Sequence, residues 1–146
     1  MAQYKAVYPA DLKIRPEVDA FFTRFYDVSD TPGLTDTYVS MFTNDATFIL
    51  ASKVSKGSDE ITALREGMWT SVASRKHTLH KIFPFGNDAT EVMIYGSVEL
   101  GMRSGSTVDV DWAGRAQLTK DASDGEYKMS FYQVYLDTGA MSAPKK

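Results

Sequence analysis

The sequence predicts an α+β domain in which three helices pack on one face of a curved, mostly antiparallel sheet. In the first half of the chain, up to about residue 73, apolar residues recur at the three- and four-residue spacing of helices. From about residue 76 to residue 137 they alternate with a period of two, in four segments separated by short turn sequences. Helices first, then a run of strands joined by short turns, are typical of an α+β arrangement.

The first helix is predicted from about Pro16 to Val28. Proline suits the first helical turn, where its missing N–H costs no hydrogen bond. The apolar residues of one helix face are Val18, Phe21, Phe22, Phe25 and Val28. A second, shorter helix is predicted to begin at Thr31-Pro32 and to end near residues 43–45, before a short strand over residues 46–51.

The third helix is predicted over Ser58–Ala73. Ser58 is a candidate N-cap, and Asp59 and Glu60 follow in the first turn, where the helix dipole favours negative charge. The apolar stripe of this helix consists of Ile61, Leu64, Met68, Trp69 and Val72.

Four strands are predicted in the second half of the chain, and they form an antiparallel meander because the connections between them are short. Their ranges are about Lys76–Phe83, Glu91–Met102, Val108–Thr119 and Lys128–Asp137. Gly96 and Gly114 lie in the middle of two long strands, where glycine often marks a bulge or bend, so we expect a strongly curved sheet.

Composition indicates one domain over residues 1–146, with a core at about residues 16–137, and it excludes several functions. The 146 residues carry 16 Lys and Arg against 19 Asp and Glu, whereas nucleic-acid binders usually have a basic excess. Cysteine is absent, which excludes a disulfide scaffold and a thiol nucleophile. No apolar run is long enough for a membrane span, and the first residues do not look like a signal peptide. We therefore expect a cytoplasmic protein that binds neither nucleic acid nor membrane.

Three short motifs resemble those of a known superfamily. They are residues 42–48 (Phe-Thr-Asn-Asp-Ala-Thr-Phe), residues 57–61 (Gly-Ser-Asp-Glu-Ile) and residues 135–137 (Tyr-Leu-Asp). Together with the element order they resemble the nuclear-transport-factor-2-like superfamily, and within it the small fungal members of the SnoaL-like group. The resemblance covers about Pro16 to Asp137 and implies a cone-shaped sheet. The superfamily includes ketosteroid isomerase, scytalone dehydratase, limonene epoxide hydrolase, polyketide cyclases and non-catalytic transport modules, so the fold alone does not give the function.

The two histidines of the chain, His77 and His80, lie on a predicted strand. A spacing of three places them on opposite faces of a strand, which argues against a shared metal, so no metal site is expected. The resemblance to scytalone dehydratase implies a catalytic role for His77. The second catalytic histidine of that enzyme has no counterpart in Glu91–Met102. A surface or hydrogen-bonded core histidine is the alternative.

Asp137 and Tyr26 are the other two candidate catalytic residues. Asp137 shares an alternation phase with Met129, Phe131 and Tyr135, and the resemblance to limonene epoxide hydrolase and the cyclases implies an acid near this place, facing the pocket. The alternative is that Asp137 begins the C-terminal turn and bonds its backbone. The resemblance also implies that Tyr26 donates a hydrogen bond to a substrate carbonyl.

Aromatic residues are the expected lining of the cone. The candidate substrate-binding residues are Phe22, Tyr38, Phe48, Trp69, Asp111, Trp112 and Tyr135. Asp111 is included because it is the nearest match to the oxyanion-stabilising Asp of ketosteroid isomerase, although a solvated position is the alternative. The general base of that enzyme has no counterpart, because residues 49–53 contain no carboxylate.

Two functional hypotheses follow. The first is a cofactor-free isomerase, cyclase or dehydratase that acts by acid/base catalysis on a small apolar, oxygenated metabolite. The second is a ligand-binding or protein-interaction module of the same fold. Both phases of the late strands hold apolar residues, so we expect a homodimer through the open sheet face. Arg115 pairs with a carboxylate or lies in this dimer face, and we favour the dimer face.

Overall fold

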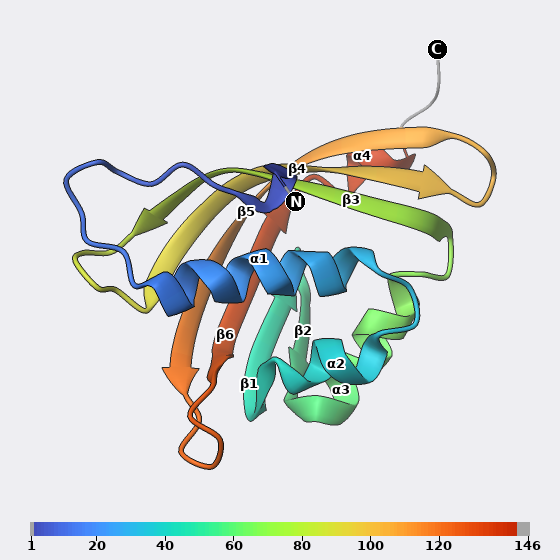
Figure 1. Cartoon of the computed structure of the whole chain (residues 1–146). Helices are drawn as coiled ribbons and strands as arrows, with labels where there is room; N and C mark the ends of the chain where they lie inside the picture. Colours follow the sequence, from blue (N-terminus) through green and yellow to red (C-terminus); the bar gives the residue numbers. More distant parts are fainter. Residues whose placement is uncertain (1, 143–146) are drawn as a thin grey trace.

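The computed structural model describes residues 2–142 (Figure 1). Within that range the helices are η1 (Ala2–Tyr4), α1 (Pro16–Asp30), α2 (Thr35–Ser40), α3 (Gly57–Gly67) and α4 (Gly139–Ser142). The strands are β1 (Phe42–Leu50), β2 (Lys53–Lys56), β3 (Val72–Pro84), β4 (Glu91–Met102), β5 (Thr107–Lys120) and β6 (Tyr127–Leu136). No described helix is long and apolar enough to cross a membrane.

The strands form one curved sheet in the order β2-β1-β6-β5-β4-β3. Neighbouring strands are antiparallel, except that β1 pairs with β6 in parallel. Helices α1, α2 and α3 lie against the concave side of this sheet, and α1 crosses in front of the strands (Figure 1). The α+β prediction is confirmed: three helices cover one face of a cone-shaped, mostly antiparallel sheet.

Several element boundaries differ from the prediction. Helix α2 begins at Thr35 rather than at Thr31-Pro32, and β1 begins at Phe42 rather than near residue 46. Helix α3 ends at Gly67 rather than near Ala73, and Val72 already belongs to β3. The predicted helix was too long because Met68 and Trp69, in the turn after α3, are still directed inward and so continue the apolar spacing of the helix. Strand β2 was not predicted.

The start of α3 also differs. No side chain caps the helix, so Ser58 is not its N-cap; instead the Glu60 carboxylate accepts a hydrogen bond from the Lys56 N–H at 2.8 Å. Gly57 has a positive φ of 80°, which turns the chain from β2 directly into the helix.

Irregularities in β3 and β6 decide which residues face the helices. The register shifts between Leu79 and Lys81 in β3, and in β6 opposite the step from Gln117 to Leu118. A bulge of one residue exchanges the inward and outward faces of the strand beyond it. In β6, Met129 is therefore buried before the bulge, and Tyr132 and Val134 are buried after it.

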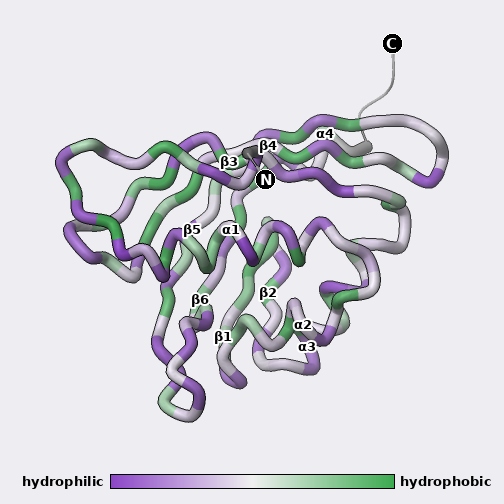
Figure 2. Tube along the Cα trace, viewed as in Figure 1, coloured by the Kyte–Doolittle hydropathy of each residue, from purple (hydrophilic) through white to green (hydrophobic). Residues whose placement is uncertain are grey.

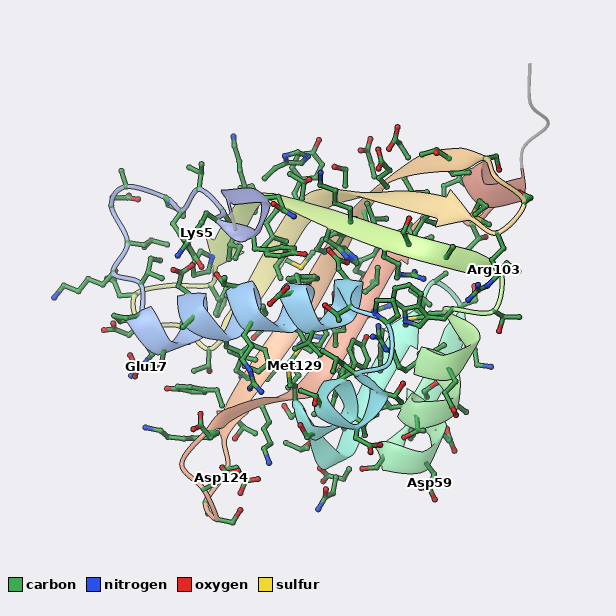
Figure 3. All side chains as sticks on the ribbon, turned by 45° about the vertical axis from the view of Figure 1, so that its right-hand side comes forward. Lys5, Glu17, Asp59, Arg103, Asp124 and Met129 are labelled. Atoms are coloured by element: carbon green, nitrogen blue, oxygen red, sulfur yellow. The ribbon has the colours of Figure 1, made fainter. Side chains whose placement is uncertain are left out.

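Aromatic side chains fill the space between α1 and the sheet. Phe25 is at their centre, with its ring 5.1–5.5 Å from the rings of Tyr26, Tyr38 and Tyr132. Met129 lies in this interior, whereas Glu17 and Asp124 point outward (Figure 3). Hydrophobic and hydrophilic residues alternate along the strands, as a sheet with one covered face requires (Figure 2).

The N-terminal segment runs beside β3 (Figure 1). Val7 forms a parallel bridge with Lys81: its N–H donates to the His80 carbonyl at 3.1 Å, and its carbonyl accepts from the Ile82 N–H at 3.0 Å. Tyr4, just before it, is buried against α1. The N-terminal segment is therefore held against β3 and against the C-terminal end of α1, where the Tyr4 hydroxyl donates to Asp30.

Candidate active site

Two neighbouring cavities lie on the helix-covered side of the sheet. The inner chamber has a volume of about 50 Å³ and is walled by aromatic and aliphatic side chains together with a few polar ones. The polar or polar-tipped residues that line it are Ser29, Tyr38, Arg75, His77, Trp112 and Tyr132.

The outer chamber is larger, at about 230 Å³, and mostly apolar. Residues such as Val72, Leu100 and Val110 line it. The residues that line both chambers are Leu50, Met68, Arg75, Val98 and Leu136. The two chambers are therefore separated only by shared side chains, with the guanidinium of Arg75 as the charged group at their boundary.

His77 and Asp30 form a hydrogen-bonded pair beside the inner chamber. His77 Nδ1 lies 2.5 Å from Asp30 Oδ1, and the two side chains are 14% and 7% exposed. The other oxygen, Asp30 Oδ2, accepts hydrogen bonds from the His77 backbone N–H at 2.8 Å and from the Tyr4 hydroxyl at 2.7 Å. Because the carboxylate accepts at Nδ1, the neutral imidazole carries its proton there, and Nε2 keeps its lone pair.

Asp30 is held in place because hydrogen bonds from Arg65 of α3 fix the C-terminal end of α1. Asp30 is the last residue of α1, and the fully buried guanidinium of Arg65 donates to three carbonyls around it. Arg65 Nη1 reaches Ser29 O at 2.6 Å, and Nη2 reaches Thr31 O at 2.8 Å and Val28 O at 3.2 Å. A cation at this end also offsets the negative end of the helix dipole, where a carboxylate is unfavourable.

Arg75 and Arg65 share an aromatic support. The Arg65 guanidinium lies over the rings of Tyr38 and Trp69, at 4.6 and 5.2 Å, and that of Arg75 lies over Trp69 at 5.6 Å. Arg75 Nη1 donates to the Met68 carbonyl at 2.6 Å. Burial lowers the pKa of both guanidinium groups, but arginine remains a cation at neutral pH.

Three buried tyrosines lie at the site: Tyr38 and Tyr132 line the inner chamber, and Tyr26 packs beside His77. The hydroxyls of Tyr26 and Tyr132 are hydrogen-bonded to each other at 2.7 Å, and the Tyr26 ring lies 5.1 Å from that of His77. Burial raises the pKa of Tyr26, Tyr38 and Tyr132 well above that of free tyrosine. All three therefore stay neutral near pH 7 and keep their hydroxyl protons, and within the Tyr26–Tyr132 pair one hydroxyl donates to the other.

The indole of Trp112 packs against Tyr26 and His77, with ring centroids 5.3 and 5.6 Å apart. It lies over Gly96 of the neighbouring strand, where a Cβ would come within 2.9 Å of the indole and 2.4 Å of the Thr78 carbonyl. Glycine at position 96 therefore makes room for this ring. Trp112 Nε1 is buried and has no hydrogen-bond partner among the described residues.

The predicted site residues divide into three groups. His77, Tyr38, Phe48 and Trp112 line the inner chamber. Tyr26, Phe22 and Trp69 do not line it. Tyr26 contacts the lining residues Tyr132, His77 and Trp112, Phe22 packs against Phe21, and Trp69 supports the two arginines.

Asp137, Tyr135 and Asp111 lie outside the site. Asp137 is exposed and accepts a hydrogen bond from the Gly139 N–H at 2.9 Å, which is the turn alternative. The bulge in β6 invalidates the phase that linked Tyr135 and Asp137 to buried Met129, so Tyr135 faces outward and is 49% exposed. Asp111 is exposed because its neighbour Trp112 points inward and alternation turns Asp111 out.

The two histidines lie on opposite faces of β3 and therefore do not share a metal ion. His77 faces α1, whereas His80 is exposed, with its ring 5.1 Å from that of Tyr95 on the other side of the sheet. Among the described residues, no group of three or more His, Cys, Asp or Glu side chains could hold a metal ion.

Sequence reasoning missed Asp30, Arg65, Arg75 and Tyr132. Two signals were present for the first two. An aspartate in the last turn of a helix opposes the helix dipole, so a partner or a function is needed to hold it there. Arg65 lies four residues after Ile61, on the apolar face of α3, where a charged residue must find buried partners.

The fold and the site together describe a small α+β cone protein with an acid–histidine pair beside a cavity. No protein-family model and no curated protein sequence matches the chain. Solved structures do match. A protein from Novosphingobium aromaticivorans described as a scytalone dehydratase aligns with a TM-score of 0.73 and 13% identity, over 84% of this chain and 83% of that one.

Two further solved structures with the same fold are described as other kinds of protein. A type 2 hexachlorocyclohexane dehydrochlorinase aligns with a TM-score of 0.68 and 13% identity, over 83% of each chain. Nuclear transport factor 2 from Cryptosporidium parvum aligns with a TM-score of 0.66 and 10% identity, over 87% of this chain and 100% of that one. The chain therefore has the nuclear-transport-factor-2-like fold.

Proposed function

We propose that the protein is a small-molecule enzyme that works by acid/base catalysis without a cofactor, with His77 as the proton-transferring group. The observation that carries this proposal is the Asp30–His77 pair, with Nδ1 and Oδ1 2.5 Å apart and His77 in the wall of the inner chamber. Two structurally similar proteins have names that describe eliminations, a dehydratase and a dehydrochlorinase, and this supports the same broad class of reaction.

In the proposed reaction, His77 Nε2 takes a proton from a carbon next to a carbonyl group of the substrate. The imidazole becomes an imidazolium, which the Asp30 carboxylate stabilises through Nδ1–H. The electrons of the broken C–H bond move toward the carbonyl oxygen, and the Arg75 guanidinium and the Tyr38 hydroxyl stabilise the negative charge there. Return of the proton to another carbon gives isomerisation. Departure of a leaving group from the neighbouring carbon gives elimination, and the imidazolium then gives its proton to the leaving group or to solvent, which restores the neutral imidazole.

A non-catalytic ligand-binding module is the second candidate function. The observation that favours it is the size of the inner chamber, because about 50 Å³ is enough for one or two water molecules but not for a whole metabolite. The lack of a second histidine in β4 points the same way. In this case the Asp30–His77 pair would bind a ligand without transferring its proton.

Deuterium exchange separates the two functions. The protein is incubated in D₂O with a set of small ketones and acids, and loss of C–H signals is followed by proton NMR. An enzyme of the proposed kind exchanges the acidic C–H protons of a fitting compound, and His77→Gln abolishes this exchange. His80→Gln is the matched control, because His80 is exposed on the opposite side of the sheet. Saturable binding without exchange in any compound would support the module.

We also propose that the protein forms a two-fold homodimer through the sheet face turned away from the helices. Exposed apolar or aromatic residues of this face are Phe83 on β3, Met93 and Tyr95 on β4, and Tyr135 on β6, with β5 between β4 and β6. Apolar patches of this kind on soluble proteins usually mark an interface.

Tyr95→Glu is expected to convert the dimer to a monomer, because a buried unpaired carboxylate is costly. Light scattering coupled to size exclusion at micromolar concentration measures the mass. Leu34→Glu is the control, since Leu34 is exposed at the start of α2 and away from this face. A monomeric wild-type protein would contradict the proposal.

A further inference from the structure

Arg65 and Arg75 place two guanidinium groups at the site, and Asp30 is an acidic side chain whose charge acts on both. No described Asp or Glu forms an ion pair with Arg65 or Arg75, and none lines either chamber. Asp30 is the nearby carboxylate, and both its oxygens are engaged by His77 and Tyr4. Arg75 lines both chambers and no Asp or Glu does, so an anionic group on a ligand would meet a cation there and no carboxylate in the lining.

Hydrogen-bond donors are also available in the inner chamber. The Trp112 side chain is buried, with the residue 4% exposed, and its Nε1–H has no hydrogen-bond partner among the described residues. No described residue bonds the hydroxyl of Tyr38, and Arg75 uses one of its N–H groups on the Met68 carbonyl. The three residues that carry these donors line the same small chamber. Donors of this kind pair with an acceptor-rich group rather than with a hydrocarbon.

The two volumes indicate how a ligand would be divided between the chambers. The inner chamber, at about 50 Å³, has room for a group of the size of a carboxylate but not for a ring. The outer chamber, at about 230 Å³, is apolar and exceeds the roughly 150 Å³ of a cavity known to take up benzene. A polar head therefore fits inside, and an apolar body of about one ring fits outside.

We infer that the ligand class is small carboxylic acids with a compact apolar body. The carboxylate lies in the inner chamber, paired with Arg75 and hydrogen-bonded by Trp112 Nε1 and the Tyr38 hydroxyl, and the apolar body occupies the outer chamber. This rests on the proposed function for the location of the site, but it concerns binding and does not need catalysis.

Benzoate and benzamide are the probes, since they share a ring and differ in charge. Their affinities are measured by NMR titration of the wild-type protein and variants. We expect benzoate to bind at least tenfold more tightly than benzamide. Arg75→Gln removes this preference, and Arg75→Lys keeps part of it because the charge remains. Trp112→Phe weakens benzoate severalfold without removing the preference for it.

Arg24→Gln is the control for net charge, because Arg24 is exposed and lines neither chamber. Equal affinities for the two probes, no saturable benzoate binding at millimolar concentration, or an unchanged preference in folded Arg75→Gln would overturn the inference. His77→Gln distinguishes this inference from the proposed function: it should keep benzoate binding while losing exchange. Exchange on uncharged ketones without benzoate binding would leave the proposed function standing and reject the ligand class.

Discussion

Replacing His77 with Gln is expected to lower kcat by about 10²- to 10⁴-fold on any compound that the protein turns over. The reason is that in the proposed reaction Nε2 takes the proton, and glutamine has no comparable basic site. The fold is expected to remain, since the His77 side chain lies at a cavity wall and its backbone pairing in β3 is unchanged. Steady-state kinetics and a thermal unfolding curve measure the two effects separately.

Asp30→Asn tests the other half of the pair. An amide does not stabilise the imidazolium as a carboxylate does, and it does not fix the Nδ1–H tautomer, so we expect a loss of at least about a hundredfold. The ¹⁵N shifts of the His77 ring report the tautomer directly. Asp27→Asn is the matched control, because Asp27 is an exposed acid on the last turns of the same helix. Full activity in Asp30→Asn would show that His77 does not depend on its partner.

Arg65→Met is expected to destabilise the protein by about 3 kcal/mol or more, because it leaves three buried or half-buried carbonyls without their donor. Methionine fills much of the volume, so the loss reports the hydrogen bonds more than a cavity. Urea unfolding measures the free energy of unfolding.

The control for this prediction is Arg24→Met, which lies on the exposed side of α1 and should change stability by no more than about 0.5 kcal/mol. Arg65→Lys should lie between, since one ammonium group does not reach all three carbonyls. A loss below about 1 kcal/mol in Arg65→Met would mean that the end of α1 is held by other contacts.

The fold was predictable because the sequence signals it locally. Pro16 marked the start of α1 to the residue, and the ranges of β4 and the later strands followed from alternation between clear turn sequences. Where the prediction erred, the cause was a feature that alternation does not reveal. A single extra residue near Ser130 turned Tyr135 outward, and no residue type there announces it.

The site was only half predictable. His77 could be singled out because histidine is scarce in this chain and suited to proton transfer. Its partner Asp30 lies 47 residues earlier, at the end of a helix, and only tertiary packing brings the two together. The same holds for Arg65, which acts on α1 from α3.

The bridge between Val7 and Lys81 has a consequence for aggregation. Outermost strands with unpaired backbone groups can recruit a strand from another molecule. At one border of this sheet, Val7 occupies backbone groups of β3; at the other border, β2 is only four residues long and carries Lys53 and Lys56. Val7 covers part of the β3 border, and the short β2, bounded by two lysines, makes the other border a poor template for strand addition.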